Sequence, residues 1–133
     1  SYAGFCMDGS RPEDSWLSGN VESVKKYYDD PLCMFDFTLN GYYGLFTTVA
    51  YDNKEKYIRQ IRKDLPMLLI SGDKDPVGAG MGVKRVYRQY KKAGIRNVAL
   101  KLYENDRHEI LNENDRADVY ADVWGWIKKN TGL

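Results

Sequence analysis

Residues 65–78 read LPMLLISGDKDPVG. The apolar run at 67–70 is typical of a parallel strand that is buried on both faces. Leu65–Pro66 forms a joint before it, because the residue that precedes a proline avoids helical geometry. In open α/β sheets, ligands bind at the carboxyl ends of the strands. The stretch therefore predicts a buried strand that carries Asp73 and Asp75 into a candidate site.

The residues that follow continue as helix, strand and helix. Four apolar residues recur at helical spacing before Gly94, a typical C-terminal stop: Val83, Val86, Tyr87 and Tyr90. Residues 98–103 alternate between apolar and polar, as a half-buried strand does, and residues 115–129 carry a last amphipathic helix. Strand, helix and strand form a parallel crossover, so the fold class is α/β. Two strands are too few for a parallel sheet, which predicts that residues 65–133 are the end of a larger, incomplete sheet.

Residues 1–64 differ in composition and pattern, because they are rich in aromatic residues and contain no convincing strand. One helix is expected to begin after Asn20 and to stop at Pro31, and another to follow Thr38 as its cap. A third, more charged helix is expected over residues 54–63. The chain thus divides into a helical region, 1–64, and a strand-and-helix region, 65–133.

Composition limits the classes of function. The chain has 133 residues, enough for one ordinary domain, and its net charge of +1 gives no basic footprint for nucleic acid or a membrane surface. No apolar run approaches the roughly 18 residues of a membrane span. Cys6 and Cys33 make neither a disulfide framework nor a paired metal site, so a cytoplasmic setting is expected.

His108 is the only histidine in the chain, and it follows the second strand just as Asp75 follows the first. Both loops open at the same edge of a parallel sheet, where an aspartate can orient an imidazole that takes a proton from a serine. The order acid before histidine is that of α/β-hydrolases. We therefore expect Asp75 and His108 to be catalytic, with Asp73 as the fallback acid.

Other chemistries fit these loops less well. His108-Glu109 begins a zincin-like motif, but Asn112 stands where the second ligand is needed, so no metal site is expected. The glycines at 78, 80 and 82 lack the third glycine of the dinucleotide fingerprint at position 83. A magnesium-dependent phosphatase that uses Asp73 and Asp75 remains an alternative, although the downstream acids of such a site are absent.

Together these motifs resemble a known family. Residues 65–78 resemble the acid-bearing strand of bacterial lysophospholipase or monoacylglycerol-lipase-like α/β-hydrolases, and residues 102–113 (LYENDRHEILNE) resemble their histidine loop. Residues 119–129 resemble the final helix. Residues 1–64, with DSWLS at 14–18 and DPLC at 30–33, look like the helical cap of these enzymes.

The resemblance implies a serine hydrolase of carboxylic esters that needs no cofactor. His108 would be the general base and then the acid, and Asp75 would orient it. The aromatic cap residues Phe35, Tyr42 and Phe46, with Phe37 and Tyr43 beside them and Val77 in the acid loop, are candidates to contact a lipid-like ester substrate, although core packing explains the rings as well.

One part of the family pattern is missing. The nucleophile of the family lies in G-x-S-x-G, and none of the six serines has that setting: Ser1, Ser10, Ser15, Ser18, Ser23 and Ser71. We therefore expect the chain to be the cap and C-terminal portion of such an enzyme, inactive alone. Its unpaired strand edge is expected to lead to self-association or to pairing with the missing N-terminal half. A non-catalytic binding module derived from the hydrolase fold is the other alternative.

Overall fold

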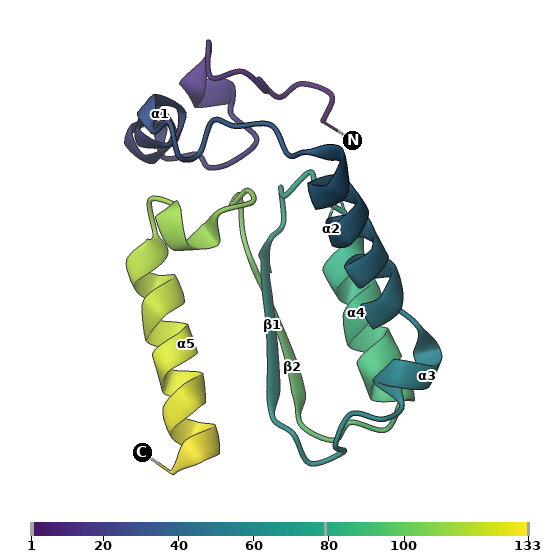
Figure 1. Cartoon of the computed structure of the whole chain (residues 1–133). Coiled ribbons are helices and arrows are strands. Elements are labelled where there is room, and N and C mark those ends of the chain that lie inside the picture. Colours follow the sequence, from purple (N-terminus) through teal and green to yellow (C-terminus); the bar gives the residue numbers. More distant parts are fainter. Residues whose placement is uncertain (1, 79, 133) are drawn as a thin grey trace.

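A two-stranded parallel sheet lies at the centre of the computed structural model, which describes residues 2–78 and 80–132 (Figure 1). Strand β1 (Met67–Gly72) pairs with β2 (Val98–Tyr103) along its whole length, and α4 (Met81–Lys92) connects them. The predicted strand–helix–strand crossover is confirmed, and with it the α/β class and the incomplete sheet.

Helices cover both faces of this sheet. Helix α4 contacts both strands, while α5 (Arg116–Thr131) lies against the opposite face (Figure 1). A short 3-10 turn, η2 (Ile110–Asn112), leads into α5. The core under α5 combines strand, turn and helix side chains: Ile70, Tyr103, Ile110, Val119 and Val123. No helix among residues 2–78 and 80–132 is long and apolar enough to span a membrane.

Two helices of the first region begin where their caps predict. The side chain of Asn20 accepts hydrogen bonds from the first turn of α1 (Val21–Asp29), and the Thr38 hydroxyl accepts one from the first turn of α2 (Leu39–Asp52). Each cap satisfies backbone N–H groups that the helix itself leaves unpaired. No residue of α2 is buried, so its apolar side chains face outward.

The expectation of a helix over residues 54–63 is wrong beyond its first turn. Helix α3 covers only Glu55–Ile58. The N–H groups of Gln60 and Ile61 then bond three residues back, which tightens and ends the helix. The carbonyl of Lys63 accepts a hydrogen bond from the N–H of Arg96 instead of one from a helical N–H. The segment before β1 is therefore already paired with the segment before β2.

Strand β1 also differs from its expectation of burial on both faces. All its residues except Gly72 are only half-buried. The reason is topological, because β2 is its only neighbour in the described part of the chain.

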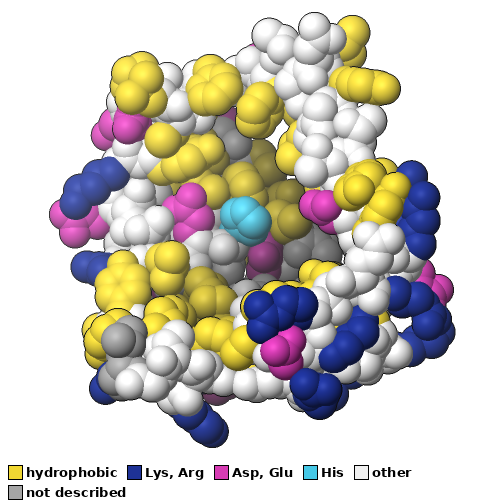
Figure 2. Space-filling view, turned by 60° about the horizontal axis from the view of Figure 1, so that its bottom comes forward, with side chains coloured by type: hydrophobic (Ala, Val, Ile, Leu, Met, Phe, Trp, Pro, Cys, Tyr) yellow, Lys and Arg dark blue, Asp and Glu magenta, His cyan; other side chains and the backbone are white. Residues whose placement is uncertain are grey.

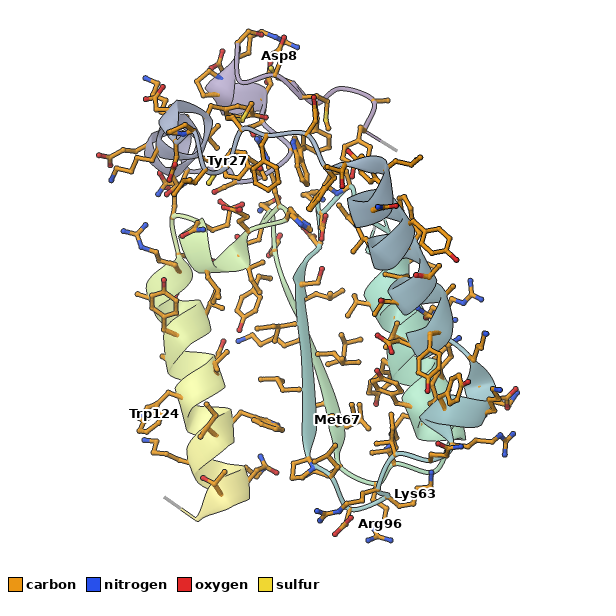
Figure 3. All side chains as sticks on the ribbon, in the orientation of Figure 1. Asp8, Tyr27, Lys63, Met67, Arg96 and Trp124 are labelled. Carbon is orange, nitrogen blue, oxygen red and sulfur yellow. The ribbon has the colours of Figure 1, made fainter. Side chains whose placement is uncertain are left out.

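The N-terminal segment lies over the carboxyl ends of the strands. Met67, at the start of β1, lies at the end of the molecule opposite Tyr27 of α1 (Figure 3). Residues 2–20, which include the 3-10 turn η1 (Pro12–Asp14), lie beside α1 at that upper end, while α2 and α3 lie on the side of α4 (Figure 1).

Candidate active site

The loops that follow the two strands are joined by backbone hydrogen bonds. The N–H of Asp73 donates to the carbonyl of Tyr103 (2.9 Å), and the N–H of Lys74 donates to that of Asp106 (2.9 Å). The Asp73 carboxylate accepts the N–H of Asn105 at 2.8 Å. Asp73, the fallback acid, thus binds backbone groups of the second loop through its own N–H and its carboxylate. It does not bond to His108.

Gly72 allows this close approach. A Cβ atom built on Gly72 would overlap the carbonyl oxygens of Asp106 and Arg107. Because real Cβ atoms do not come so close to a carbonyl oxygen, only glycine fits between β1 and the histidine loop.

The structure brings Asp75 and His108 together. His108 Nδ1 lies 3.1 Å from Asp75 Oδ2 and 3.2 Å from Oδ1, and the Asp75 residue is only 8% exposed. Asp75 Oδ1 also accepts the N–H of Val77 at 2.8 Å, which fixes the carboxylate. An ionised carboxylate only accepts hydrogen bonds, so this contact places the imidazole hydrogen on Nδ1. Nε2 is then the atom that can accept a proton.

The other side of the imidazole faces an aromatic ring. The Trp16 and His108 ring centroids lie 5.0 Å apart, with 33° between the planes. In the space-filling view the histidine lies in a hollow, beside an acidic side chain and among hydrophobic side chains (Figure 2). Its side chain is 38% exposed, so the imidazole is held by Asp75 yet accessible.

An open hollow of about 490 Å³ adjoins Trp16. Its walls are mainly aromatic and apolar side chains: Met7, Trp16, Tyr27, Tyr28, Met34, Phe35 and Tyr42. Phe35 and Tyr42, two of the candidate substrate residues, therefore share one hollow. Phe46 lies beyond Tyr42, with the two rings stacked at 6.1 Å. Val77, the remaining candidate, does not line this hollow. Its backbone N–H donates to the Asp75 carboxylate instead.

Asp106 is a buried carboxyl group of the histidine loop with a raised pKa. It is 5% exposed, and its Oδ2 has no hydrogen-bond partner among the described residues. Burial raises the pKa of Asp106 to about 7, and the nearby carboxyls of Asp115, Glu113 and Asp73 act in the same direction.

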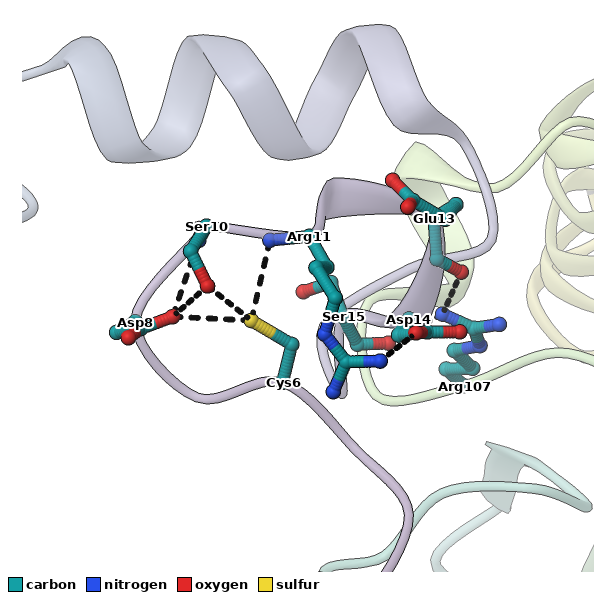
Figure 4. A network of polar contacts seen from close by, with 8 residues as sticks. All are labelled: Cys6, Asp8, Ser10, Arg11, Glu13, Asp14, Ser15 and Arg107. Carbon is teal, nitrogen blue, oxygen red and sulfur yellow. Dashed lines mark hydrogen bonds and ion pairs between the residues drawn. The ribbon is translucent and has the colours of Figure 1, made fainter.

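A polar network shapes the N-terminal loop beside the site (Figure 4). Asp8 Oδ1 accepts hydrogen bonds from the Cys6 thiol (3.0 Å) and from the Ser10 hydroxyl (2.7 Å). These bonds hold the pKa of the Asp8 carboxyl well below its usual range. The Arg11 N–H donates in turn to the Cys6 sulfur.

No serine in the described part of the chain forms a hydrogen bond with His108. Five serines belong to that part: Ser10, Ser15, Ser18, Ser23 and Ser71. The described residues also contain no group of three or more potential metal ligands. Asp73 and Asp75, the pair of the phosphatase alternative, serve separate contacts.

Sequence reasoning missed three residues around His108. Trp16 contacts its ring, and the N–H of Arg107, the residue before it, donates to the buried Glu113 carboxylate. None of the three belongs to a strand or follows a periodic pattern. The one available signal was their position, since all three lie in the segments 14–18 and 102–113 that carry the family resemblance.

Parallel strands that present an acid and a histidine at their carboxyl ends, with helices on both faces, define an α/β-hydrolase-like fold. The family of the serine aminopeptidases S33 matches residues 7–115. The chain belongs to this hydrolase family.

Among solved structures, the chain is similar to the monoacylglycerol lipase of Paleococcus ferrophilus. The TM-score is 0.74 at 20% sequence identity. The match covers 95% of this chain and 46% of the lipase chain, so this chain spans less than half of that structure. No curated protein matches the sequence.

Proposed function

We propose that this chain supplies the acid and the histidine of a serine hydrolase that cleaves carboxylic esters. The observation that carries the proposal is the contact between Asp75 and His108 at the carboxyl ends of two parallel strands. Membership of the serine aminopeptidase S33 family agrees with a hydrolase.

In the proposed mechanism, Asp75 holds the Nδ1–H of His108, and Nε2 accepts the proton of the attacking serine hydroxyl. The serine oxygen bonds to the ester carbonyl carbon, and the imidazolium then gives the proton to the leaving alcohol. Water repeats the sequence and releases the acid from the acyl-enzyme. The buried Asp75 carboxylate stabilises the imidazolium that forms in both steps.

The serine and the oxyanion hole of the proposal lie outside these 133 residues. Two observations support this part: no described serine bonds to His108, and the chain spans 46% of the lipase structure. Residues 1–64 act as the cap and 65–133 as the end of the hydrolase core. We also propose that the protein is cytoplasmic, as its low cysteine content suggests.

The substrate class we propose is a monoacylglycerol or lysophospholipid. The hollow beside Trp16 includes the rings of Phe35 and Tyr42, against which an acyl chain can pack, and Trp16 itself contacts the His108 ring. The similar structure is that of a monoacylglycerol lipase.

An esterase assay on the full gene product that contains these residues tests the proposal. His108→Ala and Asp75→Asn are expected to lower kcat for a p-nitrophenyl ester by about a thousandfold or more. Glu104→Ala is the matched control, because Glu104 is exposed and lies four residues before His108. The 133-residue chain alone is expected to show no turnover above background.

Equal activity of His108→Ala and wild type would overturn the proposal. Absence of any ester hydrolysis by the wild-type gene product would favour the alternative of a non-catalytic module. Metal-dependent hydrolysis of an aryl phosphate by the chain alone would favour the phosphatase.

A further inference from the structure

One buried carboxylate joins the histidine loop to the segment that carries Trp16. Glu113 is 3% exposed. Its Oε1 accepts the N–H of Arg107 at 2.8 Å and that of Gly19 at 3.0 Å. Its Oε2 accepts the Gly19 N–H at 2.8 Å and the Ser18 hydroxyl at 2.9 Å. The donors come from both sides, so the carboxylate bridges two segments far apart in sequence.

All donors to this carboxylate are neutral. None of the lysine and arginine side chains in the described ranges forms an ion pair with Glu113. A buried charge is costly unless hydrogen bonds replace its hydration, and Glu113 has that replacement only while both segments are in place. Separation of the segments would remove the Ser18 and Gly19 donors and leave the carboxylate with the Arg107 N–H alone, so the carboxylate resists their separation.

Arg107 strengthens the same junction from the other side. Its guanidinium donates to three backbone carbonyls of the N-terminal segment: those of Glu13, Ser15 and Ser18. Figure 4 shows the bond to the carbonyl of Glu13, which lies within the turn η1. The backbone N–H of Arg107 donates to Glu113. The backbone and the side chain of Arg107 therefore both join the histidine loop to the N-terminal segment.

Trp16 and His108 are the neighbours of these clamped residues. Trp16 lies between Ser15 and Ser18 in the chain, and His108 follows Arg107 directly. The Glu109 N–H donates to the carbonyl of Leu17 at 2.7 Å, which brings the two segments into register. The contact of the Trp16 and His108 rings at 5.0 Å is therefore set by bonds on both sides of each ring.

We propose that Glu113 is a positioning residue, which holds Trp16 against His108 and thereby fixes the direction of the imidazole toward Asp75. The role of Glu113 in catalysis rests on the proposed function. The contact between the Trp16 and His108 rings is independent of that function, and it can be measured on the 133-residue chain alone.

NMR of the chain tests the proposal, because His108 is the only histidine and its imidazole protons give one unambiguous set of signals. The Trp16 ring shifts these signals, and Trp16→Leu defines the position without that ring current. In Glu113→Ala the His108 signals are expected to move to the Trp16→Leu position. Hydrogen-exchange protection of the Gly19 and Arg107 amides is expected to fall by about tenfold to a hundredfold, the range for a lost bond to a charged group.

Glu104→Ala is the control and is expected to leave both readouts unchanged. Glu113→Gln keeps the side-chain volume but offers one oxygen in place of two, and is expected to lose protection at one or both amides. If Glu113→Ala does not fold, judged by circular dichroism, Glu113→Gln is the variant that decides. Wild-type His108 signals and wild-type protection in a folded Glu113 variant would overturn the proposal. Because no activity is read, this result is independent of the esterase assay.

Discussion

Asp106 illustrates how a single residue can couple the stability of this chain to pH. Its pKa of about 7, raised by burial and by Asp115, Glu113 and Asp73, lies above the unfolded value near 4. Between these two values the folded state binds more protons than the unfolded state, so the free energy of unfolding falls as pH rises. Below about pH 4 the ionisation of Asp106 does not lower the free energy of unfolding, and above about pH 7 its full destabilising effect is present.

We therefore predict that Asp106→Asn removes this dependence. The variant should be more stable than wild type at pH 8, by on the order of 2 kcal/mol, and similar to it at pH 4. Urea unfolding followed by circular dichroism at both pH values measures the difference. Equal stabilities at pH 8 would show that Asp106 is ionised in the folded chain at little cost.

The acid–histidine pair was accessible to sequence reasoning, whereas its surroundings were not. Chain order and the position of Asp75 and His108 after two strands were enough to expect them at one sheet edge. Trp16 approaches His108 only through the folding of the N-terminal segment onto the histidine loop, and Glu113 meets Ser18 and Gly19 in the same way. Loops have no periodicity, so the sequence carries no pattern that predicts such a contact.

At the scale of elements, β1 meets the histidine loop at Gly72. Gly72→Ala is predicted to destabilise the chain by about 1–3 kcal/mol and to separate Asp75 from His108, because the added methyl group overlaps the carbonyl oxygens of Asp106 and Arg107. Denaturant unfolding gives the loss of stability, and the His108 NMR signals report the altered site.

Gly125→Ala is the matched control. Gly125 lies within α5, and a Cβ atom there has nothing within 4 Å. Alanine favours a helix over glycine by about 0.5–1 kcal/mol, so this variant should be slightly more stable than wild type. A Gly72→Ala variant as stable as Gly125→Ala would contradict the close approach described for β1.

The elements themselves were largely predictable where caps and periodicity agree. Asn20 and Thr38 begin their helices as expected, and Gly94, with a φ of +88°, follows the end of α4. The helix at 54–63 was predicted too long, because its charged periodicity continues while the backbone already turns toward β1.

For the whole molecule, the outer edge of β1 is the exposed feature with the clearest consequence. The N–H groups of Met67 and Asp73 point toward β2, where they bond to Asn97 and Tyr103. Because alternate residues of a strand direct their N–H groups to opposite sides, that of Leu68 points to the open edge. An open edge of this kind pairs readily with another chain.

We expect the 133-residue chain to self-associate through this edge, and Leu68→Pro to weaken the association. Proline removes an edge donor and leaves the bonds to β2 intact. Leu68→Ala is the control, since it also loses the side chain but keeps the N–H. Light scattering coupled to size exclusion should find Leu68→Ala associated and Leu68→Pro monomeric. A monomeric wild-type chain would contradict the expectation.

Labelling of the full gene product, and of any polypeptide that copurifies with it, by a fluorophosphonate probe tests the proposed triad directly. Mass spectrometry then identifies the labelled serine. The proposed triad predicts one labelled serine outside these 133 residues and loss of the label in His108→Ala, with Glu104→Ala labelled as wild type. Absence of labelling, labelling of a serine within this sequence, or full labelling of His108→Ala would contradict it.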